Sequence, residues 1–153
     1  MSEPTEGGAA PDFTLETADG PVRLADFKAK TVVLYFYPKD DTTGCTNEAK
    51  AFSALAPQFA KAGAAVVGVS KDSVKSHQKF AAKYGLSIPL GADPQGKVVE
   101  AFESWVEKKL YGREYMGIDR STFLIRDGVI RKIWRKVKVA GHAQAVLDAV
   151  KAL

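Results

Sequence analysis

The chain has 153 residues, 46% of them hydrophobic and 26% charged, and its 22 Lys and Arg exceed its 18 Asp and Glu to give a net charge of +4. This size and composition are typical of one globular domain that needs no covalent cross-links. A single cysteine excludes an intramolecular disulfide and favours a reducing, cytoplasmic location. His77 and His142 lie far apart without metal-ligand spacing, so we expect both on the surface and no metal. No apolar run reaches the ~20 residues of a membrane helix, so no membrane partner is expected.

Residues 1–9 are predicted to form a flexible arm, and residues 10–153 a single domain. The arm is acidic and lacks the apolar segment of a signal peptide. Further along, residues 120–138 hold seven basic side chains and one acid. Such a stretch can contact nucleic acid, but it carries no Gly-rich or aromatic nucleic-acid motif. We therefore expect a solvated strand face and no specific nucleic-acid partner.

Apolar patterning and turn residues predict alternating strands and helices. In chain order we expect strands at 13–16, 21–24 and 31–37, a helix from about residue 43, a strand at 64–70, a helix from 72 or 73 to 84, a short edge strand at 88–90, a helix at 95–102, a loop at 103–118, strands at 121–125 and 129–134, and a helix at 142–153. Pro57 is expected to kink or split the first helix near residues 53–56, because proline lacks the amide hydrogen that a helix interior needs. The dipeptides Asp19-Gly20 and Asp127-Gly128 are the expected hairpin turns.

This order predicts an α/β fold with a mixed central β-sheet flanked by helices and an N-terminal β-hairpin. Strand–helix alternation requires parallel pairing in the first half, and the last hairpin adds antiparallel strands. Cys45 would open the first helix directly after the first core strand. A thioredoxin-like fold places its reactive sulfur at this point.

Cys45, the only cysteine, has two readings. In the first turn of a helix, a thiol faces unpaired backbone N–H groups and the positive end of the helix dipole, which favour thiolate. Alternatively, it is a small buried hydrophobe, the commoner fate of a lone cysteine. Its position after a proline and between two threonines and a glycine favours chemistry.

The residues around Cys45 are similar to a known active-site signature. Pro38-Lys-Asp-Asp-Thr42-Thr-Gly-Cys45 fits Pro-x-x-x-Thr-x-x-Cys. Further matching stretches are Ala10-Pro-Asp-Phe-Thr-Leu, Tyr35-Phe-Tyr-Pro-Lys-Asp, Val67-Gly-Val-Ser, Lys109-Leu-Tyr-Gly-Arg-Glu-Tyr-Met-Gly and Gly117-Ile-Asp-Arg-Ser-Thr-Phe-Leu-Ile. From about Ala10 onward the chain resembles the peroxiredoxins, in the branch called bacterioferritin comigratory protein or peroxiredoxin Q.

The resemblance implies a thiol-dependent peroxidase that reduces hydrogen peroxide and organic hydroperoxides without a cofactor. Cys45 would be the peroxidatic cysteine and would become a sulfenic acid. Thr42 would hydrogen-bond the sulfur and the peroxide, Arg120 would hold the thiolate and peroxide oxygens, and Pro38 would shield the thiol. Glu48 would be a partner of Arg120.

Energetics agree that a cation is needed beside Cys45. A helix N-terminus stabilises a negative charge by only ~0.3–1 kcal/mol. The leaving oxygen also needs fixed donors as the O–O bond breaks. Arg120 is the candidate for both tasks.

The chain departs from its relatives at two positions. Many members of this branch carry a resolving cysteine where this chain has Lys50, and many have proline in place of Thr43. Without a second cysteine, the sulfenic acid cannot close an internal disulfide. Recycling is therefore expected from an external thiol such as thioredoxin, glutaredoxin or glutathione, and we expect a tuning effect from Thr43.

Rival functions remain open at this point. A peroxide sensor or oxidation-activated holdase would use Cys45 without rapid turnover, and the missing resolving cysteine favours it mildly. A thiol–disulfide oxidoreductase is disfavoured because the chain lacks Cys-x-x-Cys. We expect a monomer or a weak dimer.

Overall fold

The structure, a computed structural model, describes residues 4–153. Its strands are β1 (Thr14–Thr17), β2 (Gly20–Arg23), β3 (Thr31–Phe36), β4 (Ala64–Ser70), β5 (Leu90–Ala92), β6 (Trp105–Leu110), β7 (Arg113–Ile118), β8 (Ser121–Arg126) and β9 (Val129–Trp134). Its helices are α1 (Thr43–Lys61), α2 (Val74–Tyr84), α3 (Lys97–Ala101) and α4 (His142–Lys151), with a short 3-10 helix at Leu24–Phe27. Among the described residues, no helix has the length and apolar character needed to cross a bilayer.

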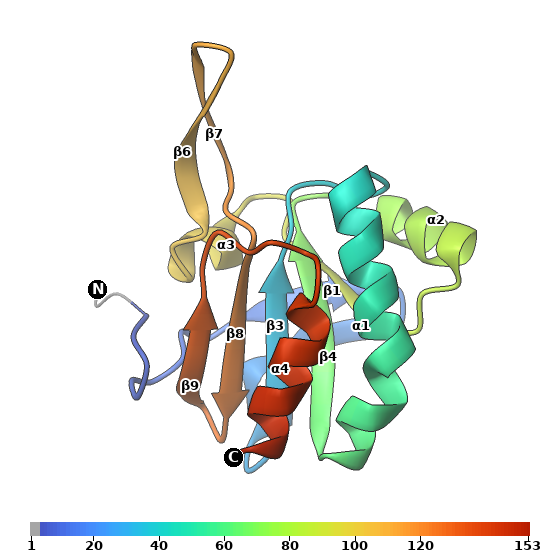
Figure 1. Cartoon of the computed structure of the whole chain (residues 1–153), viewed down its shortest axis with the longest axis vertical. Helices are drawn as coiled ribbons and strands as arrows, with labels where there is room; N and C mark the ends of the chain where they lie inside the picture. Colours follow the sequence, from blue (N-terminus) through green and yellow to red (C-terminus); the bar gives the residue numbers. More distant parts are fainter. Residues whose placement is uncertain (1–3) are drawn as a thin grey trace.

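The centre of the fold is a mixed sheet with the strand order β2-β1-β5-β4-β3-β8-β9 (Figure 1). The interior strand β3 pairs in parallel with β4 and antiparallel with β8. Every residue of β3 is buried, which explains its continuous apolar sequence. The predicted mixed sheet of a thioredoxin-like α/β fold is confirmed.

Helices cover both faces of this sheet, and alternate residues of β3 face opposite layers. Val33 and Tyr35 pack in the core with side chains of α1, α2 and α4. Val32 and Leu34 pack on the other side, with side chains of α3 and the first hairpin. The site described below lies where β3 ends and α1 begins.

Caps and turns that were predicted from sequence are present. Ser73 accepts a hydrogen bond from the backbone N–H of Ser76, and Gly85 ends α2 in the left-handed conformation. Asp127 and Gly128 both have positive φ, as a two-residue hairpin turn requires.

A split at Pro57, one of the two predicted outcomes, is wrong, because α1 runs from Thr43 to Lys61 without interruption. Pro57 cannot donate to the carbonyl of Ser53. The hydroxyl of Ser87 donates to that carbonyl instead, with 3.3 Å between oxygens, and the amide of Ser87 donates to Ser53 Oγ. A neighbouring loop thus supplies the hydrogen bond that proline removes.

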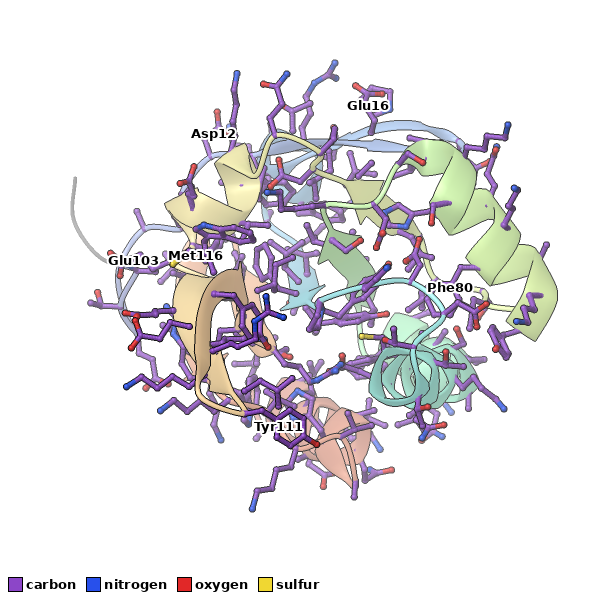
Figure 2. The ribbon with its side chains drawn as sticks, turned by 90° about the horizontal axis from the view of Figure 1, so that it is seen from above. Asp12, Glu16, Phe80, Glu103, Tyr111 and Met116 are labelled. Atoms are coloured by element: carbon purple, nitrogen blue, oxygen red, sulfur yellow. The ribbon has the colours of Figure 1, made fainter. Side chains whose placement is uncertain are left out.

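The predicted loop at 103–118 is also wrong, because β6 and β7 form an antiparallel hairpin that projects from the domain (Figure 1). Its turn is Tyr111-Gly112, with positive φ at both residues. Tyr111 is 96% exposed and lies on the outside of the molecule with Met116 (Figure 2). A hairpin with few buried side chains shows no clean alternation in sequence, so the pattern did not reveal it.

The predicted edge position of one strand is wrong. The short strand expected at 88–90 is β5, which lies inside the sheet between β1 and β4 rather than at its edge.

Residues 1–3 of the predicted arm lie outside the described residues. Residues 4–9 are docked along β9, where the amide of Gly7 donates to Ile130 and the amide of Ile130 donates to Gly8. As an edge strand, β9 offers backbone groups that can bind this segment.

Both histidines, expected on the surface, are buried. His77 is 2% exposed and His142 is 7% exposed. His142 Nε2 lies 2.8 Å from the hydroxyl of Thr122. Burial, and secondarily the charge of Arg120, lower the pKa of His142 to about 4. Sequence spacing gave no sign of metal ligation, and it carried no information on buried polar contacts.

Candidate active site

Cys45 is the third residue of α1 and is only 1% exposed. Thr42 is the N-cap of α1, and its carbonyl accepts a hydrogen bond from the amide of Thr46 over 2.8 Å. The sulfur therefore belongs to the first helical turn, where backbone N–H groups lack intrahelical partners and the helix dipole favours negative charge. The local geometry places the sulfur beside these unpaired N–H groups.

Arg120 reaches Cys45 from a part of the chain that lies 75 residues away. The antiparallel register of β3 and β8 pairs Phe36 with Ser121, so Arg120 emerges beside the point where β3 leads into the turn before α1. Its Nη2 lies 3.4 Å from Cys45 Sγ. The sheet register thus brings a permanent positive charge to the sulfur.

Glu48 fixes the other side of the guanidinium. Nη1 of Arg120 donates to Glu48 Oε1 over 2.8 Å, and Glu48 is 1% exposed. Burial raises the pKa of Glu48 to about 7, although the charge and hydrogen bond of Arg120 oppose this rise. Within residues 4–153, Glu48 Oε2 and the hydroxyl of Tyr35 are buried without a hydrogen-bond partner.

Gly44 is a site residue that sequence reasoning missed. A Cβ atom at this position would lie 3.1 Å from Arg120 Nη2, closer than ordinary side-chain contacts. Glycine therefore leaves room for the guanidinium beside the helix. The glycine next to Cys45 in the motif was the available signal.

Thr42 and Pro38 lie in the exposed turn between β3 and α1. The hydroxyl of Thr42 donates to the carbonyl of Lys39 over 2.9 Å, so it must rotate before it can donate to a bound peroxide. Pro38 begins the turn directly after Tyr37. The roles expected for both residues toward peroxide stay predictions.

Lys50 is exposed, and its Nζ lies 6.0 Å from the centre of the Tyr84 ring.

The turn also holds residues that the sequence analysis did not single out. Asp40 is 8% exposed and bonds to His77, while Asp41 bonds to Lys83. Adjacent aspartates in a polar turn gave no hint of this difference in burial. Their contacts with α2 are developed below.

The model of the AhpC/TSA family matches residues 7–133, which include Cys45, Glu48 and Arg120. The chain belongs to this family. Its peroxiredoxin relatives include peroxiredoxin Bcp of Xanthomonas campestris, which is 55% identical over 122 residues, covering 79% of this chain and 76% of the relative. The predicted membership in the bacterioferritin comigratory protein branch is confirmed.

Solved peroxiredoxin structures are also similar. Peroxiredoxin Q of Xanthomonas campestris has a TM-score of 0.87 and 49% identity, covering 92% of this chain and 90% of that one. A cysteine-to-serine variant of PrxQ from Xylella fastidiosa has a TM-score of 0.93 and 41% identity, covering 99% and 98%. The predicted enzyme class, thiol-dependent peroxidase, is thereby confirmed.

Proposed function

We propose that this peroxiredoxin reduces hydroperoxides through Cys45 and is restored by an external thiol. The Cys45 thiolate attacks one peroxide oxygen, the O–O bond breaks, and the leaving alkoxide or hydroxide takes a proton to become an alcohol or water. Cys45 is left as a sulfenic acid. One external thiol then forms a mixed disulfide with release of water, and a second thiol reduces it.

The observation that carries this proposal is the position of Arg120. One of its terminal nitrogens lies 3.4 Å from the sulfur and the other is bonded to the buried carboxyl of Glu48. This fixed fork stabilises the thiolate before attack and presents N–H groups to the oxygen that gains charge as the O–O bond breaks. In this proposal, Thr42 and backbone N–H groups supply further donors and Pro38 shields the thiol.

The proposed substrates are hydrogen peroxide and organic hydroperoxides. Structures of bacterioferritin comigratory protein from Xanthomonas campestris are described in terms of its alkyl peroxide reduction activity. Two other structures from that organism replace different cysteines by serine. This chain has one cysteine, which supports recycling by thioredoxin, glutaredoxin or glutathione.

Intact mass after one equivalent of peroxide tests the chemistry directly. We expect one added oxygen on the wild-type chain, which glutathione converts to a mixed disulfide and then to the starting mass. Cys45→Ser should show no change under the same conditions. Thiol-dependent peroxide consumption by Cys45→Ser would remove Cys45 from the mechanism.

A peroxide sensor or oxidation-activated holdase is the second candidate, favoured by the lone cysteine. In this function Cys45 is oxidised in the same way, but its sulfenic acid is not rapidly reduced. Sustained peroxide consumption with thioredoxin or glutathione supports the peroxidase. Fast oxidation in a single turnover, without consumption supported by any of these thiols, would favour the sensor.

The setting of this activity is also proposed. A lone cysteine suits a reducing cytoplasm. We propose a monomer or weak dimer, since Cys45, Glu48 and Arg120 all come from one chain. Sedimentation across a range of concentrations measures the oligomeric state.

A further inference from the structure

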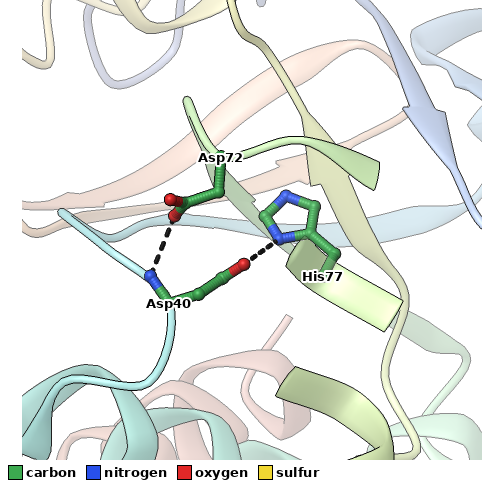
Figure 3. A group of neighbouring side chains, drawn as sticks. All are labelled: Asp40, Asp72 and His77. Carbon is green, nitrogen blue, oxygen red and sulfur yellow. Dashed lines mark hydrogen bonds and ion pairs between the residues drawn. The ribbon is translucent and has the colours of Figure 1, made fainter. Parts of the chain in front are cut away.

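Asp40 connects the turn before Cys45 to α2 through a buried set of hydrogen bonds (Figure 3). Its Oδ1 accepts from the hydroxyl of Tyr37 over 2.6 Å. Its Oδ2 lies 2.7 Å from Ser76 Oγ and 2.7 Å from His77 Nδ1. Burial raises the pKa of Asp40, but the hydrogen bonds from His77, Tyr37 and Ser76 outweigh burial and lower it.

His77 also contacts the central sheet. Its Nε2 lies 3.2 Å from the carbonyl oxygen of Gly91 on β5. His77 therefore links the sheet to the turn, with one ring nitrogen toward each.

Asp40, Asp72 and His77 place potential ligand atoms within 4.8 Å of one another, but their hydrogen bonds argue against a metal ion. Asp72 Oδ2 accepts from the amide of Asp40 over 2.8 Å (Figure 3). The same oxygen accepts from Ser70 Oγ over 2.7 Å. Oxygens of Asp40 and Asp72 already accept hydrogen bonds within the protein. The cluster therefore connects the turn before α1 to the start of α2 through hydrogen bonds.

A second, weaker set of contacts between the same turn and α2 lies beside the first. Asp41 accepts from Lys83 over 2.8 Å and from the hydroxyl of Tyr84. The side chains of Lys83 and Asp41 are 58% and 40% exposed. Solvent screens such a pair, so the buried bond of His77 to Asp40 dominates.

We propose that His77, acting through Asp40, is a positioning residue that holds the turn closed beside Cys45 for oxidation, and that release of this contact admits the external thiol. This inference rests on the proposed function. His77 does not touch the reacting atoms. It acts on the turn that contains Thr42 and leads into the first turn of α1.

The two half-reactions require opposite states of this turn. Oxidation needs Thr42 and the start of α1 held beside Arg120. A mixed disulfide needs two sulfurs about 2.05 Å apart in a restricted geometry, and Cys45 is only 1% exposed. An external thiol therefore reaches the sulfur only when the turn moves away. Weakening the bond between His77 and Asp40 should slow the first step and speed the second.

Two substitutions at position 77 separate the two bonds of the ring. In His77→Asn, the amide nitrogen takes the place of Nδ1 and can still donate to Asp40. In His77→Gln, the amide nitrogen takes the place of Nε2 and can still donate to Gly91, but Asp40 loses its partner. We expect His77→Gln to oxidise at least about tenfold more slowly and its sulfenic acid to react several-fold faster with glutathione. His77→Asn should remain within about threefold of wild type in both steps.

Lys79→Gly is the matched control, because glycine lowers helix propensity at an exposed residue of α2 and leaves Asp40, Ser76 and His77 in place. It should lower the melting temperature and leave the ratio of the two rate constants unchanged. If His77→Gln does not fold, Ser76→Ala removes one bond to Asp40 and should shift the ratio in the same direction.

Rapid quenching followed by intact mass measures both steps. A parallel decrease of both rate constants in His77→Gln, or no change in either, would overturn the positioning role. A shifted ratio in Lys79→Gly would do the same. If the wild-type chain is not oxidised by peroxide, the proposed function itself fails, which is a separate result.

Discussion

Arg120 and Glu48 form an ion pair in which Nη1 and Oε1 are 2.8 Å apart, and the side chain of Glu48 is almost completely buried. The pair leaves Nη2 of Arg120 directed at Cys45. Glu48 thereby determines where the guanidinium points, while Gly44 leaves space for it. The site depends on this orientation as well as on charge.

Arg120→Lys tests the orientation, because lysine keeps the charge but cannot bond Glu48 and Cys45 through a planar fork. We expect the second-order rate constant for oxidation by hydrogen peroxide to fall by about 10²–10³-fold. Arg126→Lys, at the exposed end of the same strand β8, is the control and should not change it. An unchanged rate constant in Arg120→Lys would show that charge alone suffices.

Glu48 should make the stability of the protein depend on pH. Its pKa rises from an ordinary 4.5 to about 7 on folding, so the folded state retains a proton that the unfolded state releases. The free energy of unfolding therefore falls as pH rises through this window, by about 3 kcal/mol. Glu48→Gln should remove this contribution, whereas exposed Glu16→Gln should not. Equal pH slopes in wild type and Glu48→Gln, measured by urea unfolding from pH 4.5 to 8, would contradict the assignment.

Gly44→Ala should separate stability from activity. Alanine stabilises a helix by about 0.5–1 kcal/mol relative to glycine, but its Cβ would press on Arg120 Nη2. We expect unchanged or higher thermal stability with oxidation about tenfold slower. Asn47→Ala, at an exposed residue of the same helix, is the control. Normal oxidation by Gly44→Ala would mean that the guanidinium tolerates displacement.

The buried tyrosines of β3 and the following turn offer a matched pair. The hydroxyl of Tyr35 has no partner within residues 4–153, whereas that of Tyr37 donates to Asp40. Removal of an unpartnered buried hydroxyl relieves a desolvation cost, so Tyr35→Phe should raise the free energy of unfolding by about 1 kcal/mol. Tyr37→Phe should lower it by about 1.5–3 kcal/mol. The same sign for both variants in chemical denaturation would refute this distinction.

Sequence patterns predicted the parts of the fold that depend on buried periodicity and local turn chemistry. The strand at Val32 to Phe36 and the helix that begins near His142 are of this kind. The peroxidatic signature placed Cys45, and the β3–β8 register explains why Arg120 lies beside it.

The remaining features depend on tertiary contacts that no local pattern records. Ser87 satisfies the carbonyl that Pro57 leaves free, so α1 continues. His77 is buried because Asp40 and Gly91 meet its two nitrogens. The hairpin of β6 and β7 stands out from the core and has no apolar alternation to detect.

The burial of a solitary cysteine gives the molecule an internal reporter. Cys45 is the only thiol and is nearly inaccessible, so every molecule of alkylating reagent that becomes attached records one opening of the turn. At high reagent concentration the labelling rate equals the opening rate itself. The exchange between closed and open sites can therefore be timed in the unmodified protein, with no other sulfhydryl to remove.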